Sequence, residues 1–372
     1  MESGIAVRIL EEKLSRVSAL VEELSLKGLL IASESMNRWF LGKGVSAITV
    51  ISDRKARVYV PVLEYTRIRD HVSRVKDIEV IAYQRYPVEP PEDMPLIRGG
   101  VEEIIKKELG AKGAFGCDYS YLGKRLLEIL SGRCVDLSED LSRIRALKTK
   151  SEIEAISRSA EIASKAFTEV TGSVREGMSE RELAGMLDRA LRIHGSDGYA
   201  FPTIVASGPN ASYPHAEPGD RRISSSDVVV IDMGAVYTGY VSDMTRMLVG
   251  SSVGSEELRA LEAVEEALNT AIEKVSPGVK ASEVDEAARK VLEKKGYGRY
   301  FIHALGHGVG VEVHEPPLLS RSSNDELREG YVVTIEPGVY IPGRFGIRLE
   351  ELLVVTSKGA EILTKPSRIT RY

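Results

Sequence analysis

The fold is decided by residues 228–249, VVVIDMGAVYTGYVSDMTRMLV, in which two apolar runs flank a short segment rich in turn-forming residues. Such a pattern predicts two antiparallel strands that are joined as a hairpin. A two-residue turn at Tyr237-Thr238 would place Asp232 opposite Asp243, with their Cβ atoms roughly 5 Å apart. Because Asp232 follows four apolar residues, its strand is expected to be buried, and burying two unpaired carboxylates is strongly unfavourable.

A divalent cation would remove this conflict between burial and like charge. It is the partner that two close carboxylates need when water cannot hydrate them. The alternative is a hydrated pair of acids at the surface. The first hairpin by itself leaves these two interpretations equally open.

A second hairpin with the same difficulty is expected towards the C-terminus. Its strands, YVVTIEPGVYI (331–341) and GIRLEELLVV (346–355), carry Glu336 and Glu350. Arg348 lies on the same strand face as Glu350 and could offset one negative charge. A salt bridge is therefore an alternative to a metal ion in this hairpin.

The two hairpins share a sequence pattern. VVVIDMGAVY (228–237) and YVVTIEPGVY (331–340) both place an acid two residues before a glycine. The turn of the second hairpin is expected around Pro342-Gly343-Arg344. Duplication of one hairpin would explain the pattern, and chance similarity between two hairpins is the alternative.

Three of the six histidines fall in the segment HALGHGVGVEVHE (303–315). His303 and His307 have the i, i+4 spacing of a helical zinc pair, but the glycines between and after them make a helix improbable. His314 could begin a zincin motif, but Leu318 occupies the position of the second histidine. The segment is therefore expected to hold an imidazole on closely packed backbone beside the two hairpins.

Together, two Asp, two Glu and one His form a mixed oxygen and nitrogen ligand set. Such a set suits manganese, cobalt, iron or zinc better than calcium. Five ligands that include bridging carboxylates suggest two metal ions, which can act on both sides of a hydrolytic step.

Composition excludes several other classes of protein. The 372 residues carry a net charge of −5 with acids and bases interleaved, so the basic surface of a nucleic-acid binder is missing. Two cysteines exclude a disulfide framework and argue against a cysteine-based metal site. No stretch approaches the roughly 18 apolar residues of a membrane helix, and the acidic N-terminus shows no secretory signal. We therefore expect a cytoplasmic protein without nucleic-acid or membrane partners.

The length of the chain and the order of its patterns predict two domains. Residues 1–142 alternate short apolar runs with amphipathic stretches, which is typical of an α/β domain. A basic linker with few apolar residues is expected at 143–150. Ser151 with Glu154 is expected to cap a long helix. That helix opens the second domain, 151–372, where helices and hairpins mix in an α+β pattern.

Six short motifs occur in a fixed order in the C-terminal half: IDMGA (231–235), SDMTR (242–246), GHGVG (306–310), VHEPP (313–317), TIEPG (334–338) and IRLEE (347–351). In this order they resemble the pita-bread-fold metallopeptidases, specifically the branch of Xaa-Pro dipeptidases (prolidases) and Xaa-Pro aminopeptidases. LKGLLIASESMNRWFLG (26–42) is similar to the creatinase-type N-terminal domain of that family, and RALKTKSEIEAIS (145–157) to its interdomain junction. The resemblance covers nearly the whole chain.

The resemblance implies two divalent metal ions per subunit, manganese or cobalt in the first place and zinc or iron as alternatives. Asp232 would bind one metal, and His307 with Glu336 would bind the other. Asp243 and Glu350 would bridge the two ions.

The resemblance also implies roles for residues around the metals. Glu336 would transfer a proton, His215 would lie beside the substrate, and His314 would contact the scissile bond. Arg348 would orient acidic ligands. His303 matches a family position near the site, where it either orients a neighbour or is purely structural.

Hydrolysis of the peptide bond before proline, by a homodimer, is the function that the resemblance implies. A prolidase that cleaves Xaa-Pro dipeptides is the first expectation, and an Xaa-Pro aminopeptidase that acts on longer peptides is the alternative. A catalytically inactive binding module of the same fold is a third possibility. Inactive relatives typically lose ligands, and all five are present here.

One position departs from the family pattern. Many relatives carry an arginine four residues after the histidine that matches His314, and that arginine can face the carboxylate of a dipeptide substrate. Leu318 stands there in this chain and offers neither charge nor donor. Arg321, three residues further on, or a residue of the N-terminal domain could replace it.

Overall fold

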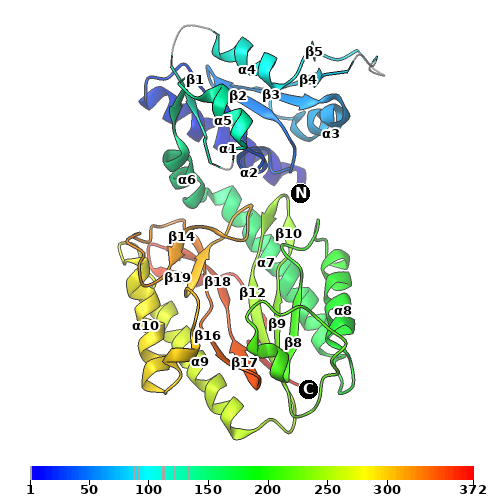
Figure 1. Cartoon of the computed structure of the whole chain (residues 1–372), viewed down its shortest axis with the longest axis vertical. Coiled ribbons are helices and arrows are strands. Elements are labelled where there is room, and N and C mark those ends of the chain that lie inside the picture. The colour runs from blue at the N-terminus through cyan, green and yellow to red at the C-terminus, as the bar shows by residue number, and fades with distance from the viewer. Residues whose placement is uncertain (1, 87–88, 90–92, 111–113, 121, 133) are drawn as a thin grey trace. The chain divides into compact units, whose positions relative to one another are not determined.

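The structure is a computed structural model, which describes residues 2–86, 89, 93–110, 114–120, 122–132 and 134–372. The chain divides into two compact units, Met1–Arg145 and Ala146–Tyr372 (Figure 1). The division falls within the segment 143–150, in which helix α6 (Ser138–Ala146) ends and helix α7 (Lys150–Thr171) begins. Among the described residues, no helix has the length and apolar composition needed to cross a membrane.

The first unit is built on a seven-stranded sheet in the order β5-β4-β3-β2-β1-β6-β7. β1, β2 and β3 pair antiparallel, and the strands outside them add in parallel, so the unit is an α/β domain, as the alternating pattern predicted. Its strands are β1 (Gly28–Ile31), β2 (Ile48–Ser52), β3 (Lys55–Pro61), β4 (Ile78–Gln84), β5 (Leu96–Arg98), β6 (Phe115–Cys117) and β7 (Cys134–Asp136). Its helices before α6 are α1 (Glu2–Glu23), α2 (Glu34–Leu41), α3 (Val62–Val72), α4 (Val101–Leu109) and α5 (Lys124–Leu130).

The two cysteines form a disulfide, which the sequence analysis did not anticipate. Cys117 ends β6 and Cys134 begins β7, and the two strands are parallel neighbours in the sheet. Their Cα atoms lie 5.8 Å apart, within the usual range for a disulfide. Two cysteines are too few for a disulfide framework, but strand pairing brings these two together across 17 residues of sequence.

The second unit places two sheets between two pairs of helices, an α+β arrangement (Figure 1). One sheet has the order β20-β12-β9-β8 and the other the order β14-β13-β15-β18-β19. Its helices after α7 are α8 (Glu180–Ile193), α9 (Ser255–Lys274) and α10 (Ala281–Lys294), with short 3₁₀ turns η1 (Gly208–Ser212) and η2 (Gly298–Tyr300). Its strands are β8 (Ile204–Ser207), β9 (Val228–Met233), β10 (Val236–Tyr237), β11 (Tyr240–Val241), β12 (Met244–Val249), β13 (Gly306–Gly308), β14 (Glu315–Leu319), β15 (Val332–Ile335), β16 (Gly338–Ile341), β17 (Phe345–Arg348), β18 (Glu351–Thr356), β19 (Gly359–Ile362) and β20 (Ile369–Arg371).

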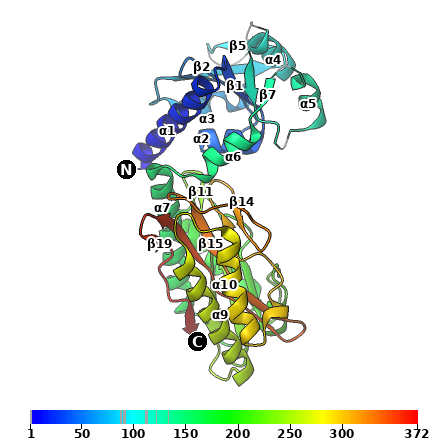
Figure 2. The same ribbon diagram turned by 90° about the vertical axis from the view of Figure 1, so that its left-hand side faces the viewer.

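Each pair of helices packs against the strands through its own apolar core, and the core under α9 and α10 includes residues of both sheets. α7 and α8 pack on β8, β9 and β12 through one cluster of buried side chains. α9 and α10, which lie side by side in Figure 2, pack on β15, β17 and β18 through another. Two helices followed by strands therefore occur twice along the chain, in keeping with the similarity between the two hairpin sequences.

The long helix α7 begins two residues earlier than predicted. Its N-cap is Thr149, whose hydroxyl accepts from the Glu152 backbone N–H while the Glu152 carboxylate accepts from the Thr149 N–H. The predicted pair, Ser151 with Glu154, has the same spacing but lies inside the helix. Two overlapping capping-box patterns in one sequence explain the error, because spacing alone does not select between them.

The first hairpin turns one residue later than predicted, at Thr238 and Gly239. Both residues have positive φ, 48° and 85°, which is the geometry of a type I′ turn and is readily adopted by glycine. The later turn shifts the strand register by two residues, so that Asp232 pairs with Thr245. Asp232 and Asp243 are therefore diagonal neighbours rather than directly opposed residues.

The second hairpin turns at residues 342–344, as predicted, because Ile341 pairs with Phe345. The ladder of β16 with β17 and the ladder of β15 with β18 share one register. Continued across the break between the two ladders, this register sets Glu336 opposite Glu350.

Candidate metal centre

The five candidate ligands come from five different chain segments and line one cavity. The cavity has a volume of about 1250 Å³ and lies within the second unit. Asp232 is on β9, Asp243 directly precedes β12, and His307 is on β13. Glu336 directly follows β15, and Glu350 directly precedes β18. Strand ends therefore position four carboxylates and one imidazole around a shared space.

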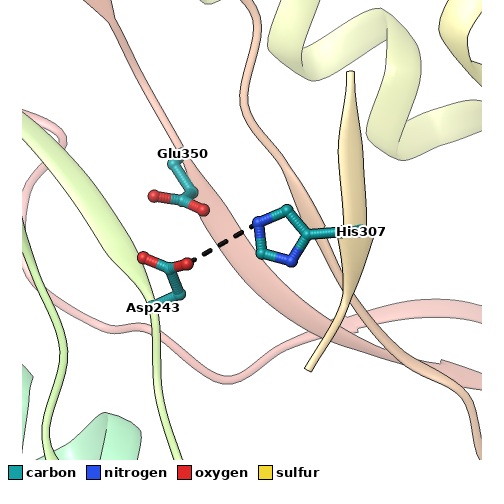
Figure 3. A group of neighbouring side chains, drawn as sticks. All are labelled: Asp243, His307 and Glu350. Carbon is teal, nitrogen blue, oxygen red and sulfur yellow. Dashed lines mark ion pairs between the residues drawn. The ribbon is translucent and has the colours of Figure 1, made fainter. Parts of the chain in front are cut away.

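The most compact group consists of Asp243, His307 and Glu350, whose side chains point toward one another (Figure 3). Each offers one ligand atom, and these atoms all lie within 4.8 Å of one another. His307 Nε2 is 3.7 Å from Asp243 Oδ2 and 3.3 Å from Glu336 Oε1. One cation could therefore contact an imidazole nitrogen and several carboxylate oxygens together.

The second ring nitrogen of His307 fixes the orientation of the imidazole. Nδ1 lies 3.1 Å from the Gly308 carbonyl oxygen, to which an Nδ1–H can donate. When Nε2 carries no proton, its lone pair is then directed toward the carboxylates, as metal binding would require. The neighbouring glycines permit this close packing. A Cβ at Gly306 would lie 2.0 Å from the Thr334 carbonyl oxygen, and a Cβ at Gly308 would lie 2.2 Å from that of Pro316.

The four carboxyl groups of the site have shifted pKa values. Burial raises the pKa values of Asp243 and Glu350 well above their ordinary range, and the charges of neighbouring carboxylates add to the effect. Burial also raises the pKa of Asp232, which Arg348 offsets in part. For Glu336, burial opposes ionisation, but the hydrogen bond and charge of His307 outweigh it and lower its pKa.

These residues fit a divalent cation. Asp232 Oδ1 is buried and accepts no hydrogen bond from the described residues, so a carboxylate oxygen with its lone pairs is directed into the site. The set of oxygen and imidazole donors suits first-row divalent metals. The raised pKa values indicate that too little positive charge lies near these carboxylates to keep them all ionised. A bound cation would supply that charge.

A buried hydrogen-bond network holds the carboxylates from outside. Arg348 Nη2 donates to Asp232 Oδ2 at 2.7 Å, and Arg348 Nε donates to Thr245 Oγ1 at 3.1 Å. The Thr245 hydroxyl in turn donates to Glu350 Oε2 at 2.9 Å. Arg348 and Thr245 thus fix one carboxylate from each hairpin.

Tyr340 connects His303 to this network. Its hydroxyl lies 3.0 Å from His303 Nε2 and accepts from Arg348 Nη1 at 2.9 Å. His303 Nδ1 lies 2.8 Å from the Ala304 carbonyl oxygen, so both of its ring nitrogens are engaged. Burial lowers the pKa of His303. In this structure His303 supports Tyr340, and its Nδ1 also lies 4.0 Å from Glu336 Oε2.

His215 and His314 line the same cavity with exposed side chains. The rings of His307 and His314 meet edge to face, with their centroids 4.4 Å apart. His314 therefore lies directly beside a candidate ligand. His215 belongs to an irregular segment, residues 213–218, that lines the cavity.

A buried ion pair supports the loop that carries His314. Lys148 Nζ lies 2.9 Å from Glu315 Oε2, and both side chains are almost fully buried. Glu315 Oε1 accepts from the backbone N–H groups of Val311 and Glu312. Glu315 therefore closes the loop on itself and ties it to the start of the second unit.

Leu318 and Arg321 occupy different surroundings. Leu318 lines the cavity, is 52% exposed and pairs with His307 across β13 and β14. Arg321 is not among the residues that line the cavity. Its guanidinium binds Glu293 of α10 at 2.7 Å and approaches Glu286 at 4.0 Å.

Four supporting residues of the site were not predicted from the sequence: Thr245, Tyr340, Lys148 and Glu315. Thr245 carries a weak sequence signal, because it lies two residues after Asp243 on the same strand face. The other three have no local pattern that indicates their partners, which are 8 to 167 residues away in sequence.

Comparison with known proteins identifies the class. Residues 154–357 match metallopeptidase family M24, and residues 13–147 match the creatinase/prolidase N-terminal domain. The chain belongs to metallopeptidase family M24 and is a peptidase. It joins a creatinase-type N-terminal domain to a catalytic domain of pita-bread fold, as the six motifs predicted.

Individual relatives match along almost their whole length. The Xaa-Pro dipeptidase of Pyrococcus furiosus is 34% identical over 96% of this chain and 99% of the relative, and that of Pyrococcus horikoshii is 35% identical over 97% and 99%. The solved structure of prolidase from Pyrococcus furiosus covers 94% of this chain and 99% of its own, with a TM-score of 0.79. An X-Pro aminopeptidase from Thermotoga maritima is 30% identical, with a TM-score of 0.85 over 96% and 99%.

Proposed function

We propose that this chain is a dinuclear-metal peptidase that hydrolyses the peptide bond before proline, with Xaa-Pro dipeptides as its substrates. The observation that carries the proposal is the meeting of Asp232, Asp243, His307, Glu336 and Glu350 in one cavity. The two Pyrococcus relatives described above, at 34% and 35% identity, are Xaa-Pro dipeptidases, whereas the X-Pro aminopeptidase is 30% identical, which favours a prolidase over an aminopeptidase. The retained ligand set argues against an inactive binding module.

Two metal ions are proposed, with Asp243 and Glu350 as shared ligands. Asp232 would complete one site, and His307 with Glu336 the other. Metals bound there would supply an activated water and polarise the scissile carbonyl. Manganese or cobalt is proposed first, and zinc or iron remains possible for this donor set.

The surrounding residues would do the remaining chemistry. Glu336 is 17% exposed on its side chain and lies next to His307, so its carboxylate can accept a proton on the substrate side and return it to the leaving nitrogen. His314 lies beside His307 and could donate a hydrogen bond where negative charge develops on the scissile carbonyl oxygen. His215, on the irregular segment 213–218, would orient the substrate.

The homodimer and the cytoplasmic location expected from the sequence stay predictions. Substrate length is also open to test, because Leu318 provides no cation for a dipeptide carboxylate. Among the described residues that line the cavity, Arg348 is the one arginine or lysine, and it is already engaged by Asp232 and Tyr340. Longer peptides, whose proline carbonyl is neutral, avoid this requirement.

A panel of substrates tests the proposal. Metal-loaded protein is assayed with an Xaa-Pro dipeptide, the matched Xaa-Ala dipeptide, an Xaa-Pro-Xaa tripeptide and a peptide that begins with methionine. We expect cleavage before proline, with the Xaa-Ala dipeptide left intact. Preference for the tripeptide would favour the aminopeptidase alternative. Cleavage of the methionine peptide alone would contradict specificity for proline.

A further inference from the structure

The segment that carries His215 has no secondary structure of its own. Residues 213–218 lie outside the helices and strands, and all six line the cavity. The His215 side chain itself is exposed. Each residue held in one backbone conformation costs about 1–2 kcal/mol of conformational entropy, so a fixed position for His215 requires anchors outside the segment.

Glu180 provides an anchor at both ends of this segment. It is the first residue of α8 and is fully buried. Before the segment, Oε1 accepts from the Ser207 backbone N–H and from the Ser207 hydroxyl, both at 2.7 Å. After the segment, Oε2 accepts from the Gly219 backbone N–H at 3.1 Å. One carboxylate therefore ties together two points of the backbone that flank His215.

Further bonds strengthen this clamp. Asn210 Nδ2 donates to both oxygens of Glu180, at 3.2 and 3.1 Å. Hydrogen bonds to an ionised acceptor are roughly twice as strong as those between neutral groups, and a carboxylate at the start of a helix is favoured by the helix dipole. Arg221 Nη1 also donates to the Ser207 hydroxyl, which itself donates to Glu180. The Ser207 hydroxyl thus links the positive charge of Arg221 to the Glu180 carboxylate.

The middle of the segment is tied to the metal centre. Arg348, which holds Asp232, also donates from Nη1 to the Pro214 carbonyl oxygen at 3.1 Å. Pro214 directly precedes His215. The segment is thus held at its ends by Glu180 and at its middle by a residue of the carboxylate network, with His215 between these anchors.

We propose that Glu180 is a positioning residue for His215, which it holds against the cavity by closing the ends of the 207–219 segment. The inference rests on the proposed function through the role given to His215. Glu180 is not among the residues that line the cavity. The hydrogen-bond partners of its carboxylate in the described part of the chain are Ser207, Asn210 and Gly219, so its influence on the reaction passes through the segment.

Glu180→Gln tests the clamp with minimal change in shape. The amide has one acceptor oxygen in place of two, and its N–H groups face other donors, so one end of the segment is released. We expect kcat/KM to fall by about tenfold to a hundredfold, since a misplacement of about 1 Å can cost that much, while metal content stays that of the wild type. Glu182→Gln is the matched control, because Glu182 lies on the same helix and caps only Ser179.

A double-mutant cycle separates positioning from general destabilisation. In the His215→Ala background, Glu180→Gln should cause little further loss, since the group that it positions is absent. An equal loss in both backgrounds would overturn the proposal, as would equal activity of Glu180→Gln and Glu182→Gln. If Glu180→Gln does not fold, Asn210→Ala removes one arm of the clamp and should produce a smaller loss with the same dependence on His215.

Amide hydrogen exchange provides a readout that does not need activity. Peptides that cover residues 211–218 should exchange faster in Glu180→Gln than in Glu182→Gln. Unchanged exchange there would overturn the clamp even if the enzyme is active. Glu180→Gln could exchange faster while the wild-type protein itself leaves Xaa-Pro peptides intact. That result would support the clamp and contradict the proposed function.

Discussion

The cavity has an inner wall and an outer wall of opposite character. The inner wall is formed by the five candidate ligands, which are largely buried. Arg348 donates to Asp232, Thr245 donates to Glu350, and His307 contacts Glu336. The outer wall consists of Tyr213, Ile302 and Leu318, with exposed fractions of 63%, 66% and 52%. The five residues of the inner wall come from five of the six shared motifs, whereas the outer wall includes the position that departs from the family pattern. We therefore propose that the inner wall sets the chemistry and that the outer wall sets which peptides reach it.

The largest expected effect comes from the inner wall. Asp243→Asn keeps the shape of the side chain but removes a negative charge from the centre of the ligand set. We expect metal occupancy and hydrolysis to fall to background, as measured by elemental analysis and peptide cleavage on the same samples. Asp325→Asn is the control, because Asp325 lines the same cavity outside the ligand set. Full activity of Asp243→Asn would contradict its role as a ligand.

Variants of His215 and His314, which also line the cavity, should distinguish metal binding from catalysis. His215→Ala and His314→Ala should retain both metals, since neither residue is a proposed ligand. Each should lose about 10²–10⁴-fold in kcat, the usual contribution of a positioned proton-transfer or hydrogen-bonding group. Elemental analysis checks the division of roles, and loss of a metal from either variant would move that histidine into the ligand set.

A smaller effect is expected from the network behind the inner wall. Thr245→Val removes the hydroxyl that links Arg348 to Glu350. Metal affinity should weaken by about 10–100-fold, as is typical when the partner of a ligand is lost. Titration of the apoprotein with manganese measures this change. Thr245→Ser retains the hydroxyl and should bind metal as the wild type does; equal weakening in both variants would point to packing instead.

The smallest effect is expected on the outer wall. Leu318→Arg should raise kcat/KM on an Xaa-Pro dipeptide severalfold relative to a tripeptide, because a guanidinium can pair with the dipeptide carboxylate. Ile302→Arg adds the same charge to another part of this wall and is the control. An unchanged ratio would remove Leu318 from the carboxylate pocket. Arg321→Ala should leave the ratio as it is, since Arg321 is bound to Glu293; a selective loss on dipeptides would reverse that expectation.

The strand patterns and motifs predicted much of the fold because each depends on local sequence. Apolar runs that end in an acid predicted the strands of both hairpins, and the six motifs predicted the residues that the structure brings together. The register of the first hairpin was wrong because the turn depends on positive φ at Thr238 and Gly239. That backbone requirement, rather than the symmetry of the two aspartates, selects the turn.

Other features could not be read from local patterns because their partners are distant in sequence. Arg321 binds Glu293 of α10, 28 residues away, and this pairing exists only once α10 packs beside β14. The Cys117–Cys134 disulfide depends on the parallel pairing of the edge strand β7 with its neighbour β6. Glu180 is one of two acids that begin α8, and only the folded 207–219 segment distinguishes its role from that of Glu182.

Metal stoichiometry measured together with turnover tests the central claim most directly. Protein is stripped with a chelator and titrated with manganese, and bound metal per chain and hydrolysis of an Xaa-Pro dipeptide and tripeptide are followed on the same samples. We predict two bound ions per chain, no turnover in the stripped protein, and activity that returns as the sites fill. Full turnover after exhaustive removal of metal would contradict the claim that these five residues act through divalent cations.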